Sequence, residues 1–160
     1  MAAAWDCPVT VQFLPQYAMK QPHPEDMVEV LRRWEDVRAN QLLTENQKKM
    51  LQDSGEQEFI LLLDENKTYE LQPYAQLETE EPLRAFLFER MGKRWVVYWH
   101  AEGEGRLAVD IPDMLLMNEL YEAPVPLDEP GTVPVGDRRY LVTDLSEEEV
   151  RAAFAKAKLM

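Results

Sequence analysis

The sequence predicts an α+β fold that is mainly β, with an antiparallel β-sandwich or sheet of about seven to eight strands. The main observation is residues 83–111, LRAFLFERMGKRWVVYWHAEGEGRLAVDI, where aromatic and β-branched residues are interrupted only by short glycine-containing turns. Such a pattern predicts a three-stranded antiparallel meander. Helical patterns occur only towards the two ends of the chain, which predicts an N-terminal amphipathic helix region and a short C-terminal helix.

The composition fits one domain, or one small domain with an appendage. The chain has 160 residues, 46% of them hydrophobic, with four Trp, six Tyr and five Phe, whereas disordered chains are poor in such residues. Thirty acidic and seventeen basic residues give a formal net charge of −13. A surface of that charge repels phosphate backbones and anionic lipids, so we expect neither a nucleic acid nor a membrane as a partner.

Cysteine content and hydropathy set further limits. Cys7 is the only cysteine, which excludes an intrachain disulfide and a metal site built from cysteines. The first residues lack the basic and apolar segments of a signal peptide, and no apolar run reaches the ~20 residues of a transmembrane helix. We therefore expect a soluble protein that is cytoplasmic as given, with its location open if the chain is part of a longer protein.

The N-terminal region predicts a strand followed by a helix. Residues 9–14 (VTVQFL) are β-rich and bounded by prolines, which favours a short strand. Pro24 suits the first position of a helix, and the two acidic residues after it complement the helix dipole. We expect this helix to bury an apolar stripe against the sheet or a partner. The stripe consists of Met27, Val30, Leu31, Trp34 and Val37.

A second helix and a hairpin are expected next. Thr44 and Gln47 have the spacing of a capping box, which predicts a short helix from Glu45 that ends by Gly55. Residues 59–71 contain an apolar run, a polar loop and a return strand, which predicts a β-hairpin.

The change from helical to strand periodicity predicts the domain organisation. We expect residues 1–55 to form an N-terminal strand and helical segment that packs on the main domain. Residues 56–160 are expected to form the antiparallel β-domain with the C-terminal helix.

The C-terminal third predicts one more strand, a hairpin and a helix. Residues 114–121 are apolar enough for a strand, and Gly136 and Asp137 lie between two β-rich runs as a hairpin turn would. Ser146 and Glu149 form a second capping box at the start of a closing helix. We expect its buried face to consist of Val150, Ala153, Phe154 and Ala157.

The aromatic meander contains the residues that we expect to bind a ligand. Because successive side chains of a strand point to opposite faces, Trp95 and Trp99 share one face. Tyr98 and His100 share the other. Exposed aromatic rings can stack on sugars while carboxylates and amides bind the hydroxyls. We expect the tryptophan face to be the more buried one, which makes Tyr98 and His100 the better ligand candidates. The full candidate set is Trp95, Tyr98, Trp99, His100 and Glu102.

Metal and catalytic chemistry receive less support from the sequence. His100, Glu102 and Glu104 alternate where a strand turns and could offer ligands to a divalent cation. An acidic turn is ordinary on a protein surface, however, and we predict no metal and no cofactor.

Among the acids, Glu89, Glu102 and Asp110 lie nearest the aromatic residues and would be tested first as catalytic carboxylates. We expect them to be solvated surface acids, as most are. No serine or cysteine nucleophile motif and no phosphate-binding glycine loop occurs.

Four segments carry a resemblance to a known class of protein: VTVQFLP, VEVLRRWEDVR, EFILLLDENKTYELQPY and KRWVVYWHAEGEGRLAV. In its order of a lone strand and helix, a compact β-domain and a terminal helix, the chain resembles the C-terminal accessory β-domain of bacterial glycoside-hydrolase-type multidomain proteins. The resemblance implies a non-catalytic domain that buttresses or extends the substrate cleft of a neighbouring catalytic domain. A carbohydrate or that catalytic domain would be its partner. No catalytic signature is included, so no site residues are implied.

Two other classes of function stay open. The chain could be a self-contained protein–protein interaction module whose partner docks on an acidic, aromatic-rimmed surface or on an open sheet edge. It could also be a small carboxylate-based hydrolase that uses Glu102 or Glu89.

Overall fold

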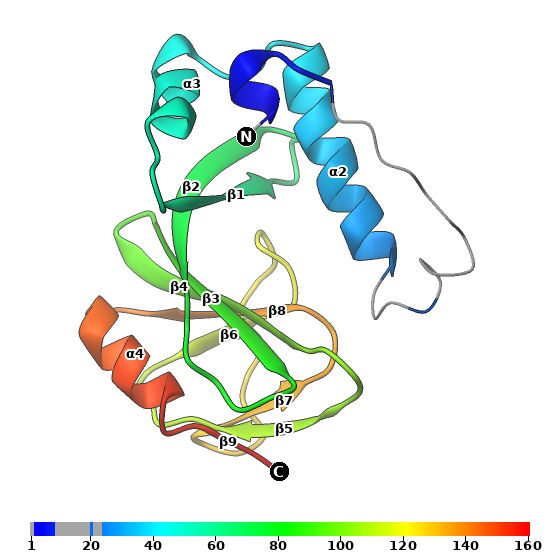
Figure 1. Cartoon of the computed structure of the whole chain (residues 1–160). Coiled ribbons are helices and arrows are strands. Elements are labelled where there is room, and N and C mark those ends of the chain that lie inside the picture. The colour runs from blue at the N-terminus through cyan, green and yellow to red at the C-terminus, as the bar shows by residue number, and fades with distance from the viewer. Residues whose placement is uncertain (1, 9–19, 21–23) are drawn as a thin grey trace. The chain divides into compact units, whose positions relative to one another are not determined.

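The computed structural model describes residues 2–8, 20 and 24–160 (Figure 1). The strand predicted at residues 9–14 lies outside the described residues. The described part contains three α-helices, one 3-10 helix and nine strands, in sheets of six and three strands. The predicted α+β, mainly β class is therefore confirmed. The chain divides into two compact units, Met1–Gln72 and Pro73–Met160; the periodicity of the sequence placed a boundary near residue 55.

The first unit is a small helical and β assembly. It contains η1 (Ala2–Trp5), α2 (Pro24–Ala39), α3 (Glu45–Gln52), β1 (Glu58–Leu63) and the start of β2 (Tyr69–Gln76). The predicted capping box starts α3: Thr44 Oγ1 accepts a hydrogen bond from the Gln47 backbone, and Gln47 Oε1 accepts one from the Thr44 backbone at 2.8 Å. One apolar core holds the unit together. It consists of Ala3, Ala4, Val37, Leu43, Leu51, Phe59, Leu61 and Leu71.

The apolar stripe of α2 is buried only in its C-terminal half. Val37 belongs to the core of the first unit and Trp34 packs against it. Towards the N-terminus of the helix, Met27 is 42% exposed and Val30 is 53% exposed. Within the described residues the whole stripe is therefore not buried, and burial of its exposed part against a partner stays a prediction. The core of the first unit is small, and α2 contributes only its later turns to it.

Acidification is expected to weaken the first unit partly through Glu29 of α2. Its carboxylate accepts hydrogen bonds from Arg32 at 2.7 and 2.8 Å and from Arg33 at 2.8 Å, and these bonds lower its pKa from 4.5 to about 2. A carboxyl whose pKa is lower in the folded state adds stability that is fully present above its unfolded pKa and is lost as the pH falls through its folded pKa.

The melting temperature of Glu29→Gln should therefore fall less than that of the wild type when the pH is lowered from about 5 to about 2. A matched control is Glu65→Gln, because Glu65 is exposed in the connection between β1 and β2. Equal falls in wild type and Glu29→Gln, measured by circular dichroism, would contradict the assignment.

The second unit contains most of the sheet structure. In the larger sheet the strand order is β1-β2-β3-β4-β8-β6, and the smaller sheet has the order β7-β5-β9. Its one helix, α4, is Glu147–Phe154 and starts at the predicted Ser146 and Glu149 capping box. The strands that begin in this unit are β3 (Leu83–Arg90), β4 (Lys93–His100), β5 (Gly105–Ala108), β6 (Leu115–Met117), β7 (Thr132–Val135), β8 (Arg139–Thr143) and β9 (Lys158–Leu159).

One face of the larger sheet, the smaller sheet and α4 share a single core in the second unit. Residues from β3, β4, β8, β5, β7 and α4 belong to the same buried cluster. The predicted buried face of the closing helix is confirmed, since Val150 and Phe154 are fully buried and Ala153 and Ala157 pack against the cluster. Two sheets that share one core in this way form a sandwich-like arrangement.

The predicted meander is correct for its first two strands and wrong for the third. β3 and β4 pair antiparallel over all eight residues of each strand, through a turn in which Met91 and Gly92 both have positive φ, as two-residue hairpin turns require. β5 leaves this sheet and pairs with β7 and β9, while β8 takes the second edge of β4. The chain between β4 and β5 bends at residues 101–103, which redirects it into the smaller sheet.

Candidate functional site

The middle of β4 is buried on both faces. On the core face, Tyr98 is 0% exposed, and its hydroxyl donates a hydrogen bond to the carbonyl of Pro134 at 3.1 Å. Burial raises the pKa of the Tyr98 hydroxyl. The prediction that Tyr98 is among the better ligand candidates is corrected here, because a ring enclosed in the core cannot meet a ligand. Tyr98 is a packing residue.

Trp95 is also a packing residue, on the opposite face of β4. It is 6% exposed, and its indole N–H donates to the carbonyl of Arg90 at 3.0 Å. Its ring stacks on Phe88 with centroids 6.2 Å apart and meets Tyr140 edge-on at 6.4 Å. Trp95 therefore does not offer a ring face to a ligand.

Partly exposed aromatic side chains remain at the His100 end of the same face. Trp99 stacks on Phe86 with centroids 5.3 Å apart and an interplanar angle of 26°. Phe86 in turn meets Tyr74 edge-on at 5.4 Å. All three side chains are half-buried. We call Tyr74, Phe86 and Trp99 the Trp99 cluster.

A polar hollow of about 390 Å³ adjoins the Trp99 cluster. The hollow lies at the connection between β2 and β3 and is lined by Gln76, Leu77, Glu78, Thr79, Glu81 and Arg84. Arg84 is the register partner of Trp99 in β4, and Gln76 is the partner of Phe86 in β3. Because directly paired residues project on the same face of a sheet, Arg84 and Gln76 lie on the face that carries the cluster.

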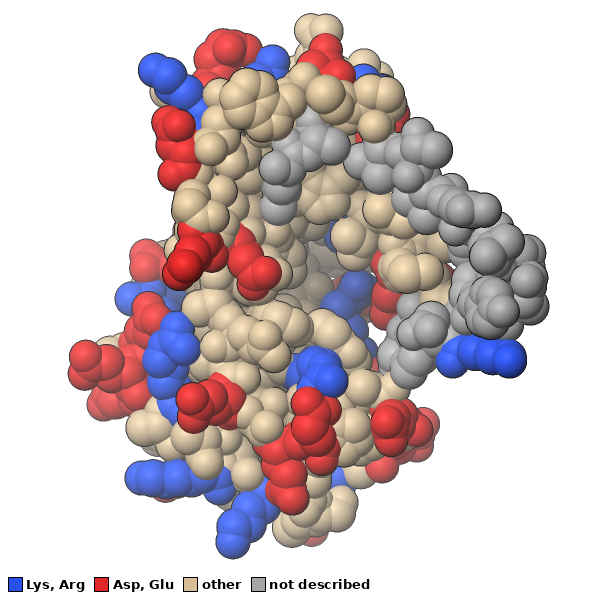
Figure 2. Space-filling model, viewed as in Figure 1, with Lys and Arg blue, Asp and Glu red and all other residues tan. Residues whose placement is uncertain are grey.

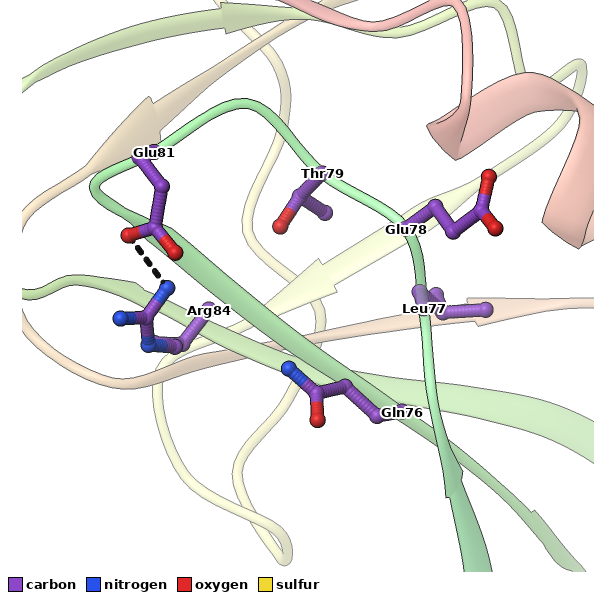
Figure 3. A pocket seen from close by; sticks show the side chains of 6 residues that line it. All are labelled: Gln76, Leu77, Glu78, Thr79, Glu81 and Arg84. Atoms are coloured by element: carbon purple, nitrogen blue, oxygen red, sulfur yellow. Dashed lines mark hydrogen bonds and ion pairs between the residues drawn. The ribbon is translucent and has the colours of Figure 1, made fainter.

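The side chains of the hollow offer both hydrogen-bond donors and acceptors. Glu81 forms an ion pair with Arg84, and Figure 3 shows this pair and the Gln76 amide on one side of the connection, with Glu78 pointing away from them. Thr79 Oγ1 donates to the carbonyl of Leu83 at 2.8 Å, which holds the connection in place. The hollow and the Trp99 cluster together combine aromatic surface with a few polar groups.

The turn residues that were considered as possible metal ligands, His100, Glu102 and Glu104, are not brought together. Nδ1 of His100 accepts a hydrogen bond from the Glu102 backbone at 3.2 Å, so this nitrogen caps its own turn. Glu102 and Glu104 are exposed. Among the described residues no group of three or more His, Cys, Asp or Glu side chains is arranged to hold a metal ion.

The acids that were candidates for catalysis are separated. Glu89 is exposed and forms an ion pair with Arg94 near the β3–β4 turn. Glu102 follows the opposite end of β4, and at roughly 3.3 Å per residue the strand between them spans about 20 Å. Glycosidic cleavage needs a pair about 5 to 10 Å apart, so Glu89 and Glu102 cannot act together. Asp110 is exposed and lines a second groove.

The sequence analysis missed the polar half of the candidate site. Gln76, Glu81 and Arg84 belong to a stretch that reads as a surface connection and the start of a strand. A signal was present nonetheless: the Met91 and Gly92 turn fixes the β3–β4 register, and that register pairs Arg84 with Trp99.

Surface charge and hydropathy agree with the composition. On the face shown in Figure 2, acidic and basic side chains are interspersed and no large basic patch is visible. No helix of the described residues is long and apolar enough to cross a membrane.

Comparison with protein-family models, with curated proteins and with solved structures finds no match to this chain.

Proposed function

We propose that the chain is a non-catalytic accessory domain of a larger protein and that its second unit binds carbohydrate at the Trp99 cluster and the adjoining hollow. The observation that carries the proposal is the register of β3 and β4, which places the half-buried Trp99 directly opposite Arg84. A sugar ring presents an apolar face to an aromatic side chain and hydroxyls to polar neighbours. Gln76 and the Glu81–Arg84 pair supply those polar neighbours.

The same geometry favours carbohydrate binding without catalysis. The Glu81 carboxylate is already paired with Arg84, and the other acid of the hollow, Glu78, points away from that pair (Figure 3). Two acids facing one scissile bond are therefore not assembled in the hollow. A site of this kind would hold a carbohydrate chain for a catalytic domain elsewhere in the protein.

Isothermal titration of the intact chain with a panel of neutral oligosaccharides tests the proposal. Saturable binding is expected with at least one member, and Trp99→Ala should weaken it about tenfold or more, since stacking and apolar contact contribute roughly 1.4 kcal/mol or above. Met91→Ala is the matched control, because Met91 is 80% exposed at the turn that ends the same hairpin. Circular dichroism would verify that both variants are folded.

Two results would contradict the carbohydrate proposal: unchanged binding in Trp99→Ala, or flat titrations with every sugar. Flat titrations would instead favour the interaction-module hypothesis. The observation behind that alternative is the exposed apolar half of α2, where Met27 and Val30 are 42% and 53% exposed.

A further inference from the structure

A second groove in the second unit, of about 570 Å³, lies between α4 and the chain that follows β5. Its apolar lining includes Val109, which is fully buried, and the half-buried Leu145 and Ala153. Charged side chains also line it: Asp110, Glu149, Lys156 and Lys158. Grooves of about 300 to 1,000 Å³ with an apolar lining and a few polar groups are typical of small-molecule sites.

Lys156 and Lys158 differ from the other cations of the second unit, which is described without gaps. Six others form ion pairs: Arg84, Lys93, Arg94, Arg106, Arg138 and Arg151. Arg90 lies over the ring of Trp95, and Arg139 donates to Asn118. Lys156 and Lys158 are the cations of this unit whose side chains form no ion pair, hydrogen bond or ring contact with a described residue, although the chain carries a net charge of −13. Both line the same groove.

The two acids of the groove, Glu149 and Asp110, differ in what holds their carboxylates. Glu149 is engaged in the capping box of α4, where its carboxylate accepts hydrogen bonds from the backbone of Ser146 at 2.8 Å and from its hydroxyl at 2.7 Å. These bonds lower the pKa of Glu149 and direct its charge to the start of the helix. Both acids of the groove therefore oppose an anion, but Glu149 is held at the helix start by Ser146, and Asp110 is the acid that can be replaced without removing the capping box.

We propose that this groove binds a small organic acid, with its carboxylate between Lys156 and Lys158 and its apolar body on Leu145 and Ala153. Charge complementarity selects an anion, because two ammonium groups lack an acidic partner. The apolar lining selects a ligand with an apolar body, since a strongly hydrated ion such as inorganic phosphate gains nothing from contact with aliphatic side chains. This site is separate from the Trp99 cluster and does not depend on the carbohydrate proposal.

Isothermal titration with hexanoate, hexanol and hexylamine tests the inference on the intact chain. Hexanoate should bind saturably and more tightly than either analogue, and added salt should weaken it because the lysines are exposed. The double variant Lys156→Gln, Lys158→Gln should weaken hexanoate binding about tenfold, as expected for two partly exposed ion pairs of somewhat under 1 kcal/mol each. Asp110→Asn should tighten it by about twofold to fivefold, because a like charge is removed.

Two controls separate this groove from other surfaces. Lys49→Gln removes an exposed charge from α3 in the first unit and should leave hexanoate binding unchanged. Trp99→Ala should also leave it unchanged, which would keep the two sites distinct. Absence of hexanoate binding, equal binding of hexanol, or full binding in the double lysine variant would each overturn the inference.

Discussion

Replacing Tyr98 with alanine is expected to destabilise the second unit by about 3 to 5 kcal/mol, the cost of deleting a large aromatic side chain from a core. Tyr98 is 0% exposed and belongs to the cluster formed by the two sheets and α4. Its removal would leave a cavity in this cluster, where its register partner Ala85 is also buried. The free energy of unfolding, measured in urea by circular dichroism, checks the prediction.

The conservative change Tyr98→Phe separates the ring from the hydroxyl. It keeps the packing of the ring and removes the hydrogen bond to the carbonyl of Pro134, which should cost about 1 kcal/mol. A Tyr98→Ala variant that keeps wild-type stability while losing carbohydrate binding would show that Tyr98 contacts a ligand. That result would contradict its placement in the core.

Local signals in the sequence were sufficient for most of the elements. Thr44 with Gln47 and Ser146 with Glu149 predicted the starts of two helices, because the capping residues and their partners lie three positions apart in the chain. The β3–β4 hairpin was predictable for the same reason, since a turn with Gly92 joins two adjacent strands. When the interacting residues lie within a few positions of each other, their spacing can be recognised in the sequence.

Long-range pairing left no comparable pattern. The alternation at residues 105–108 correctly indicates a strand, but the partners of β5 are β7 and β9, and nothing in its own sequence specifies them. The extent of burial of α2 was equally inaccessible. Its apolar stripe continues from Val37 to Met27, whereas the core that could cover it does not.

The candidate site was only partly predictable because strand alternation gives the face of a residue and not its depth. Of the five predicted ligand residues, Trp99 is half-buried and adjoins the hollow, while Trp95 and Tyr98 are core residues. From the sequence we expected one whole face of this strand to be buried and the other to be exposed. In the structure exposure depends on position along the strand, because the four central residues of β4 are buried on both faces and the residues at its two ends are only partly buried. The unbroken apolar run WVVYW is the pattern typical of such a strand.

Replacing Trp95 with alanine is therefore expected to destabilise the protein by about 3 to 5 kcal/mol, whereas Trp99→Ala should cost about 1 kcal/mol or less. The two tryptophans are on the same strand and the same face, so the comparison isolates burial from residue type. Trp95 loses its stacking on Phe88, its edge contact with Tyr140 and the hydrogen bond to the Arg90 carbonyl.

Urea unfolding of both variants, with Trp95→Phe as a control, measures this difference. The phenylalanine variant should recover part of the stability, because a smaller ring can still pack between Phe88 and Tyr140 but cannot donate to the Arg90 carbonyl. Equal losses in Trp95→Ala and Trp99→Ala would contradict the distinction between a buried centre and a partly exposed end of β4. The proposed carbohydrate site depends on that distinction, since a sugar can reach a tryptophan only where the strand is not covered.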